Sequence, residues 1–150
     1  MPATGVRKDH QTASMFRVEI DGMESGSFSK CAGLKSESEV FEYQEGGDNE
    51  SVRKLVGPTK ASNIVLTKGF VSDARLFHWR DEIAAGGTKK IERRNGAVIA
   101  LAQDGKTELG RWSFTKAWPV RWEMTEFDGS SNQAACEILE LAVEKISKSR

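Results

Sequence analysis

The sequence has few of the residues on which enzymes and secreted proteins depend. Its 150 residues include two histidines, two cysteines and three prolines. No apolar run approaches the ~20 residues that a membrane-spanning helix needs. The N-terminus lacks the apolar core of a signal peptide. These absences predict a chain that folds in the cytoplasm, so that any export would need other machinery.

The two cysteines, Cys31 and Cys136, are far apart in the sequence and match no metal-ligand spacing. In a cytosolic protein the expected state is two buried, reduced thiols, and a disulfide is the alternative.

The sequence contains no recognisable catalytic motif. Its histidines are His10 and His78, and no G-x-S-x-G motif accompanies them. His78 lies off the apolar stripe of the helix predicted below, so a surface or interface position is expected. The segment GGTK at 86–89 lacks the spacing of a phosphate-binding loop and is better explained as the end of a helix. We therefore predict no catalytic residue, no metal ligand, no cofactor and no enzymatic activity.

Charges are balanced overall but unevenly distributed. The chain has 22 basic and 22 acidic residues, so no general attraction to nucleic acid or anionic membrane is expected, and self-association is favoured. The window 36–50 holds six acidic residues and no basic one. A solvated acidic face is the ordinary explanation. The alternative is pairing of Glu39 and Glu42 with a later basic group: Lys89, Lys90, Arg93 and Arg94.

The N-terminal half is predicted to be strand-rich. Residues 1–14 carry no apolar periodicity and are expected to form a flexible arm, followed by one domain over 15–150. Phe16, Val18 and Ile20 alternate with polar residues, which predicts a half-buried strand. Further strands are expected at Ser27–Cys31, at Leu34–Glu45, where most residues are polar, and at Ile64–Phe70.

A long polar segment separates the last two of these strands. Residues 45–60 include Gly46, Gly47 and Gly57 and have little to bury, so they are predicted to form a loop. Within a compact domain, a loop of this length is usually either disordered or in contact with a partner.

One helix is predicted in the middle of the chain. Ser72 or Asp73 can cap it, a stripe of Leu76, Trp79 and Ile83 forms its buried face, and Gly86-Gly87 ends it.

The C-terminal half is again strand-rich. Strands at 97–103 and 108–115 flank Asp104-Gly105, a hairpin turn sequence. Beyond it, apolar side chains occupy even positions and predict one apolar face: Trp112, Phe114, Trp118, Val120, Trp122 and Met124. Pro119 predicts a bend, bulge or edge. The segment 136–147 fits a strand or a helix, and a strand is favoured because the preceding strands need a partner.

Together these elements predict six to eight strands and one helix. The expected fold class is mainly β (α+β): a small antiparallel β-barrel or sandwich with one helix and a long inter-strand loop.

Several segments, taken in order, resemble the tail-tube family. They are FRVEIDG, CAGL, FEYQEGGDN, KLVGPTK, IVLTKGF, Trp79, IERRNGAVIAL and WSFTKAWPVRW, and they span about Phe16 to Val143. This family comprises the small subunits that build the inner tube of contractile phage tails and extracellular contractile injection systems. A more distant likeness is to the tube protein of type VI secretion systems. Two departures are Val56, where the family often has proline, and the C-terminal VEKISKSR.

The resemblance implies a homo-oligomeric structural protein whose hexameric rings stack into a hollow tube. Its partners would be a surrounding sheath, baseplate and terminator or cap proteins, and a cargo of protein effector or DNA in the lumen, without sequence-specific nucleic-acid binding. The assembled particle, a virion or an injection system, would pierce the target membrane. The long loop would reach the neighbouring ring, with contact residues Glu45, Gly46, Gly47, Asp48, Asn49, Arg53, Lys54, Leu55, Gly57 and Lys60.

Three alternatives remain open at this point. A baseplate-proximal paralogue that initiates the tube belongs to the same family. A monomeric β-barrel binding module would use the tryptophan-rich strands as a ligand platform. An enzyme on a small barrel would need an acid–base constellation that the sequence does not contain.

Overall fold

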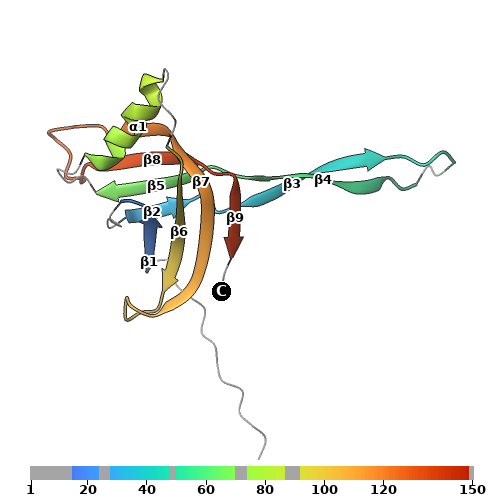
Figure 1. Ribbon diagram of the computed structural model, residues 1–150, viewed down its shortest axis with the longest axis horizontal. Coiled ribbons are helices and arrows are strands. Elements are labelled where there is room, and N and C mark those ends of the chain that lie inside the picture. The colour runs from blue at the N-terminus through green and yellow to red at the C-terminus, as the bar shows by residue number, and fades with distance from the viewer. Residues whose placement is uncertain (1–14, 24–27, 48–49, 70–73, 87–91, 149–150) are drawn as a thin grey trace, which may run out of the picture.

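The computed structural model describes residues 15–23, 28–47, 50–69, 74–86 and 92–148. Figure 1 shows a β-rich body, one helix that covers part of it, and a two-stranded arm that projects far from the body. The elements are β1 (Phe16–Ile20), β2 (Phe28–Ala32), β3 (Ser36–Tyr43), β4 (Arg53–Ala61), β5 (Ile64–Gly69), α1 (Arg75–Ala85), β6 (Arg94–Leu101), β7 (Glu108–Met124), β8 (Cys136–Ala142) and β9 (Lys145–Lys148).

The described residues contain nine strands, so the prediction of six to eight was too low. The sequence pattern missed β4, and it treated β8 and β9 as one segment. The strand favoured for residues 136–147 is confirmed, as β8 and then β9. The flexible arm predicted for residues 1–14 lies outside the described residues.

The body is one antiparallel seven-stranded sheet in the order β1-β6-β7-β8-β5-β2, with β9 also paired to β7. The 17-residue β7 pairs with β6 and β9 along its first part and with β8 along its second. Figure 1 shows β1, β6 and β9 running across the direction of β2, β5 and β8, so the sheet folds over itself at β7. Within the described chain, the edge strands β1 and β2 do not pair with each other. The mainly β, sandwich-like antiparallel fold with one helix is confirmed.

The main core lies between the two halves of the folded sheet and beneath α1. The predicted alternation of β1 is confirmed, because Val18 and Ile20 are buried. The helix contributes Leu76 and Trp79, and the Trp79 indole N–H donates to the Glu92 carbonyl at 3.1 Å. The other buried members of this core are Ile64, Leu66, Val98, Phe114, Ala117, Leu139 and Leu141.

The two ends of α1 differ in how well they were predicted. Gly86 ends the helix as expected, with a φ of 58° and its N–H bonded to the Ile83 carbonyl. At the other end Ala74 is the N-cap and makes no side-chain capping bond. The predicted caps, Ser72 and Asp73, lie outside the described residues.

The single apolar face predicted for β7 is wrong between residues 115 and 121. Phe114 is buried as expected, but the next buried positions are Ala117 and Pro119, which are odd-numbered. Lys116 adopts a φ of 51° and donates its backbone N–H to Asn95 Oδ1 at 3.0 Å. The pairing with β6 shifts here, and an extra residue in one strand reverses the faces.

A second shift reverses the alternation again. The pairing of β7 with β8 is irregular between Pro119 and Arg121, which confirms the prediction of a bulge at Pro119. Beyond it Trp122 packs against the main core.

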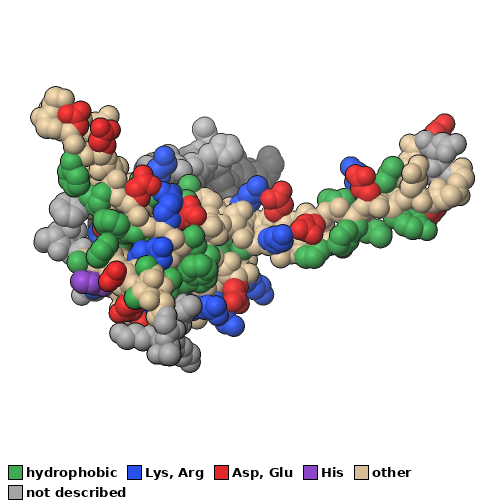
Figure 2. Space-filling model, turned by 90° about the horizontal axis from the view of Figure 1, so that it is seen from above, with side chains coloured by type: hydrophobic (Ala, Val, Ile, Leu, Met, Phe, Trp, Pro, Cys, Tyr) green, Lys and Arg blue, Asp and Glu red, His purple; other side chains and the backbone are tan. Residues whose placement is uncertain are grey.

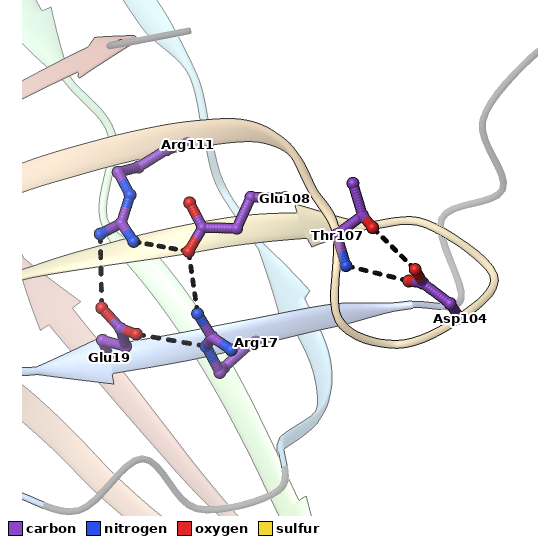
Figure 3. A network of polar contacts seen from close by, with 6 residues as sticks. All are labelled: Arg17, Glu19, Asp104, Thr107, Glu108 and Arg111. Carbon is purple, nitrogen blue, oxygen red and sulfur yellow. Dashed lines mark hydrogen bonds and ion pairs between the residues drawn. The ribbon is translucent and has the colours of Figure 1, made fainter.

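The hairpin predicted at Asp104-Gly105 is confirmed (Figure 3). Gly105 has a φ of 72°, in the left-handed region that glycine tolerates. The Asp104 carboxylate accepts hydrogen bonds from the Thr107 N–H, the Thr107 hydroxyl and the Lys106 N–H. These bonds, led by those from Thr107, lower the pKa of Asp104 to about 2.

A ring of four charged side chains covers the opposite face of the sheet (Figure 3). Arg17 and Arg111 lie on either side of Ile99 in the strand register. Glu108 Oε1 bridges the two guanidinium groups, at 3.0 Å from Arg17 and 2.9 Å from Arg111. Glu19 joins them on the other side, at 3.2 and 3.3 Å. Ile99 lies beneath this ring and is fully buried, and the four charged groups form ion pairs with one another within the subunit.

Both cysteines are free thiols, as predicted, but each is partly exposed rather than buried. Cys31 lies on the edge strand β2 and Cys136 at the first position of β8, where neighbouring strands cover them incompletely. Partial burial still raises the pKa of Cys31 to about 11. In the described part of the chain, no helix has both the length and the apolarity to span a membrane.

Candidate assembly arm

The feature that the body leaves unexplained is the projecting arm, residues 36–61. It consists of β3 and β4, paired antiparallel and joined by residues 44–52. The loop predicted over residues 45–60 is therefore wrong from Arg53 onward, since Arg53–Ala61 forms β4. What stabilises β4 is its pairing with β3, because none of its residues is buried.

A bulge explains why β4 resembled a loop in the sequence. The register shifts between Ser38 and Val40, so that Glu39 faces both Gly57 and Pro58. A Cβ on Gly57 would lie 2.6 Å from the Glu39 carbonyl oxygen, and only glycine allows that approach. Pro58 has no N–H to offer a ladder, and a bulge tolerates that loss. Gly57-Pro58 thus bends a strand without ending it.

The predicted contact residues lie along this arm. Glu45, Gly46 and Gly47 are in the connection at its tip, where Gly47 has a φ of 98°. Arg53 returns from the tip and its Nε lies 3.4 Å from Glu45 Oε1. Asp48 and Asn49 lie outside the described residues. The remaining predicted residues are on β4: Lys54, Leu55, Gly57 and Lys60.

All described residues of the arm except the half-buried Gly57 and Ala61 are exposed to solvent. All eight residues of β3 are exposed. Figure 2 shows hydrophobic side chains mostly along one edge of the arm, with some on the other edge, where the charged side chains mainly lie. An isolated two-stranded ribbon is marginally stable in water, and exposed apolar patches of this kind mark interaction sites. The large exposed hydrophobic residues here are Val40, Phe41, Tyr43, Val52, Leu55 and Val56.

Strand register sorts these side chains onto two faces. Phe41 pairs with Leu55, and Tyr43 lies two residues along on the same side; we call these three the aromatic face. Val40 pairs with Val56 on the opposite side, and we call these two the valine face. Apart from Leu55, sequence reasoning did not select these residues as contacts. The available signal was their isolation within an otherwise polar strand.

The acidic residues of β3 find basic partners within the arm. Lys60 Nζ lies 2.9 Å from Glu39 Oε1, and Glu42 is opposite Lys54 in the register. Exposed pairs of this kind contribute little to stability. Basic residues of β4 therefore supply part of the positive charge that was predicted to come from residues 89–94.

The second basic group is only partly described. Lys89 and Lys90 lie outside the described residues, and Arg93 is exposed. Arg94 serves the subunit interior: it pairs with Glu92 at 3.0 Å and donates to the Asp21 carbonyl at 2.7 Å. Its guanidinium also lies over the Trp79 ring, 5.7 Å from the centroid.

A folded body with a long arm that is exposed and apolar on both faces defines a class of protein, the subunit of a larger assembly. The family model described as "T4-like virus tail tube protein gp19" matches residues 12–147 of the chain. The chain belongs to this family, and it is a tail tube protein of contractile phage tails and contractile injection systems. No curated protein sequence matches it.

Solved structures share the fold. A chain of the PVC sheath-tube complex, an extracellular contractile injection system, has 25% identity and a TM-score of 0.81, with 93% of this chain and 91% of that chain covered. A chain of the anti-feeding prophage cap has 24% identity and a TM-score of 0.84, with 99% of each covered. Hcp1 from Flavobacterium johnsoniae has 18% identity and a TM-score of 0.59, with 90% and 94% covered. The resemblance to tail tubes, and the more distant one to type VI proteins, is confirmed.

Proposed function

We propose that this chain forms hexameric rings that stack into a hollow tube, and that the β3–β4 arm joins each subunit to its neighbours. The observation that carries the proposal is the exposure of apolar side chains on an arm that the body cannot cover. Membership of the tail tube family supports it. The role is structural, and the chain performs no catalysis of its own.

The partners follow from the particles in which similar folds occur. Those structures are described as a sheath-tube complex, a tube terminating cap and a baseplate. We accordingly propose a sheath around this tube, with baseplate and terminator proteins at its ends. The lumen passes protein or DNA without base-specific contacts. Subunits assemble in the bacterial cytoplasm, and only the complete particle pierces a target membrane.

Within this proposal the predicted contact residues act from the arm. The tip contributes Glu45 to Asn49, and β4 contributes Arg53, Lys54, Leu55, Gly57 and Lys60. In addition to their partners within the arm, Glu39 and Glu42 pair in this proposal with basic groups of a neighbour, Lys89, Lys90 and Arg93. Arg94 is excluded, because its guanidinium is engaged inside the subunit. Residues 15–150 act as one domain.

An arm deletion tests the proposal. Ser38 and Thr59 are paired, and their hydroxyls are 2.8 Å apart, so residues 39–58 can be replaced by an Asn-Gly turn without unpairing what remains. The expected product is a folded monomer or ring, with the circular dichroism of a β protein, that forms no tubes in negative-stain images. Tubes of normal length from the shortened chain would refute the proposal.

A further inference from the structure

We propose that Gly33, Asn63 and Glu140 form a joint at the base of the arm, and that this joint fixes the direction of the arm in the free subunit. Gly33 and Asn63 lie where the arm leaves the body, and Glu140 lies on β8, where it accepts a hydrogen bond from Asn63. This inference rests on the proposed function and extends it. It concerns what sets the direction of the arm before any neighbour is present.

The arm continues a ribbon that begins inside the body. The pairing of β2 with β5 ends at Ala32 and Val65. The pairing of β3 with β4 begins at Ser36 and Ala61. Three residues separate these two pairs on each strand, so the register of the body ribbon passes unchanged into the arm. Figure 1 shows β3 and β4 leaving the body as an extension of β2 and β5. The register at the base of the arm is therefore set within the subunit.

Gly33 brings the two strands of this ribbon into close contact at the joint. Its φ is 94°, in the left-handed region that residues other than glycine rarely adopt. A Cβ at this position would lie 2.1 Å from the Asn63 carbonyl oxygen, which belongs to the backbone of the opposite strand. Two residues further along, the Ser62 N–H donates to the Lys35 carbonyl at 3.1 Å. The two backbones are in contact here, so one strand cannot swing without moving the other.

A chain of polar contacts connects the joint to the body sheet. The Asn63 side-chain amide donates to Glu140 Oε2 at 3.2 Å. Glu140 Oε1 lies 3.5 Å from Arg121 Nη2 on β7, and Arg121 also pairs with Glu123. Asn63 is exposed and Glu140 is half-buried, so these contacts contribute little to the stability of the body. They restrict orientation instead, because they connect the base of the arm to β8, a strand outside the ribbon.

A fixed direction matters for assembly because it is a form of preorganisation. A subunit whose arm already has the direction that it takes in the assembly does not lose further conformational entropy on binding. If only about a tenth of the free subunits hold that direction, the critical concentration for assembly rises about tenfold. Gly33, Asn63 and Glu140 are therefore positioning residues, which act on assembly through the direction of the arm.

The distance between two spin labels measures the direction of the arm in the free subunit. One label is attached at Gln44→Cys, near the tip of the arm, and the other at Gln103→Cys, in the β6–β7 turn. Cys31 and Cys136 are replaced by alanine so that only these positions react. Double electron–electron resonance is recorded below the critical concentration, and again in tubes made mostly of unlabelled chain. The expected result is one narrow distance distribution with the same mean in both states.

Substitutions at the joint should broaden this distribution in the free subunit without lowering the urea midpoint. Asn63→Ala and Glu140→Ala each remove the side-chain contact and should have this effect. Glu140→Gln is the conservative variant, because its amide oxygen still accepts from Asn63, and its distribution should stay narrow. The matched control is Ser29→Ala, which removes a hydrogen bond of the same length, 3.2 Å to the Thr67 carbonyl, from the body part of the ribbon. It should leave the distribution unchanged.

Gly33→Ala tests the backbone contact and should broaden or shift the distribution. Its control is Gly129→Ala, whose Cβ would meet nothing within 4 Å. If Gly33→Ala does not fold, the Asn63 and Glu140 variants still test the joint.

The outcomes separate this inference from the proposed function. A narrow distribution that broadens in Asn63→Ala and Glu140→Ala, but not in Glu140→Gln, supports the joint. A broad distribution in the free subunit, a different mean distance in tubes, or no response to Asn63→Ala and Glu140→Ala overturns it. The measurement on the free subunit does not depend on tube formation. Failure of the unlabelled chain to form tubes under assembly conditions would instead count against the proposed function.

Discussion

The contact between Trp122 and Glu137 allows a quantitative test of how the helix-bearing side of the body is stabilised. Glu137 is 3% exposed, and its Oε1 accepts the Trp122 indole N–H at 2.5 Å. Its other carboxylate oxygen, Oε2, has no hydrogen-bond partner among the described residues. The ring of Phe77 on α1 packs edge-on against Trp122, with centroids 4.8 Å apart. A charged group is therefore held in the core by one donor beneath the helix.

Replacing the indole by a phenyl ring should lower the free energy of unfolding substantially. Trp122→Phe removes the only described donor to a buried carboxylate, and losing a hydrogen bond to a charged group costs about 1.5–3 kcal/mol. The smaller ring removes roughly another 1 kcal/mol of apolar burial. The expected destabilisation is about 3 kcal/mol. Glu137→Leu should cost only about 1 kcal/mol, because the unpaired indole N–H is offset by removal of a buried charge.

The double variant shows whether Trp122 and Glu137 interact with each other or whether each side chain only contributes packing. With both polar groups absent, Trp122→Phe with Glu137→Leu should cost about 2 kcal/mol, which corresponds to a coupling of about 2 kcal/mol. Urea unfolding followed by circular dichroism measures these values, in the arm-shortened chain so that assembly does not contribute. Costs that add to within about 0.5 kcal/mol would refute the argument, since residues that do not interact behave additively.

Two further predictions concern the arm and the β6–β7 turn. Gly57→Ala should abolish tube assembly without changing the unfolding midpoint of the monomer, because the added Cβ would clash with the Glu39 carbonyl. The control is Gly46→Ala, whose Cβ would meet nothing within 4 Å, and tubes are counted in negative-stain images. Asp104→Ala should lower the urea midpoint near neutral pH. That difference should vanish between pH 4 and about 2, because folding lowers the pKa of Asp104 and its carboxylate stabilises the native state only while it is ionised. A difference that grows toward acid would contradict this sign.

Periodicity predicted those elements whose burial repeats locally. β1 alternates strictly and α1 has an apolar stripe, so each shows its buried face in the sequence. The faces of β7 could not be predicted in this way, because they reverse at Lys116. That bulge depends on a hydrogen bond to Asn95, which is 21 residues away in the sequence. A local pattern contains no information about such a contact.

That residues 45–60 make contacts stays a prediction, and the strand structure of this segment was not foreseen. The residues that the resemblance implies as contacts fall within the arm, and all of them except Asp48 and Asn49 are described by the structure. The strand β4 was missed because Gly57-Pro58 ordinarily ends a strand, whereas here it forms a bulge opposite Glu39. The apolar faces were missed as well, since a few apolar residues in a polar strand usually indicate partial burial within the subunit.

The arm and the body of the subunit are structurally separate. No residue of β3 or β4 belongs to the main core, so changes in the arm alter association without altering the fold. Conversely, Glu108 forms ion pairs with Arg17 and Arg111 within the body, and these ion pairs need no neighbour. Residues 36–61 contain six acidic and three basic residues and carry a net charge of −3, and the rest of the chain carries +3. This difference favours contacts between the arm and other parts of a neighbouring chain over pairing of like surfaces. Contacts of that polarity propagate in one direction, as a tube requires.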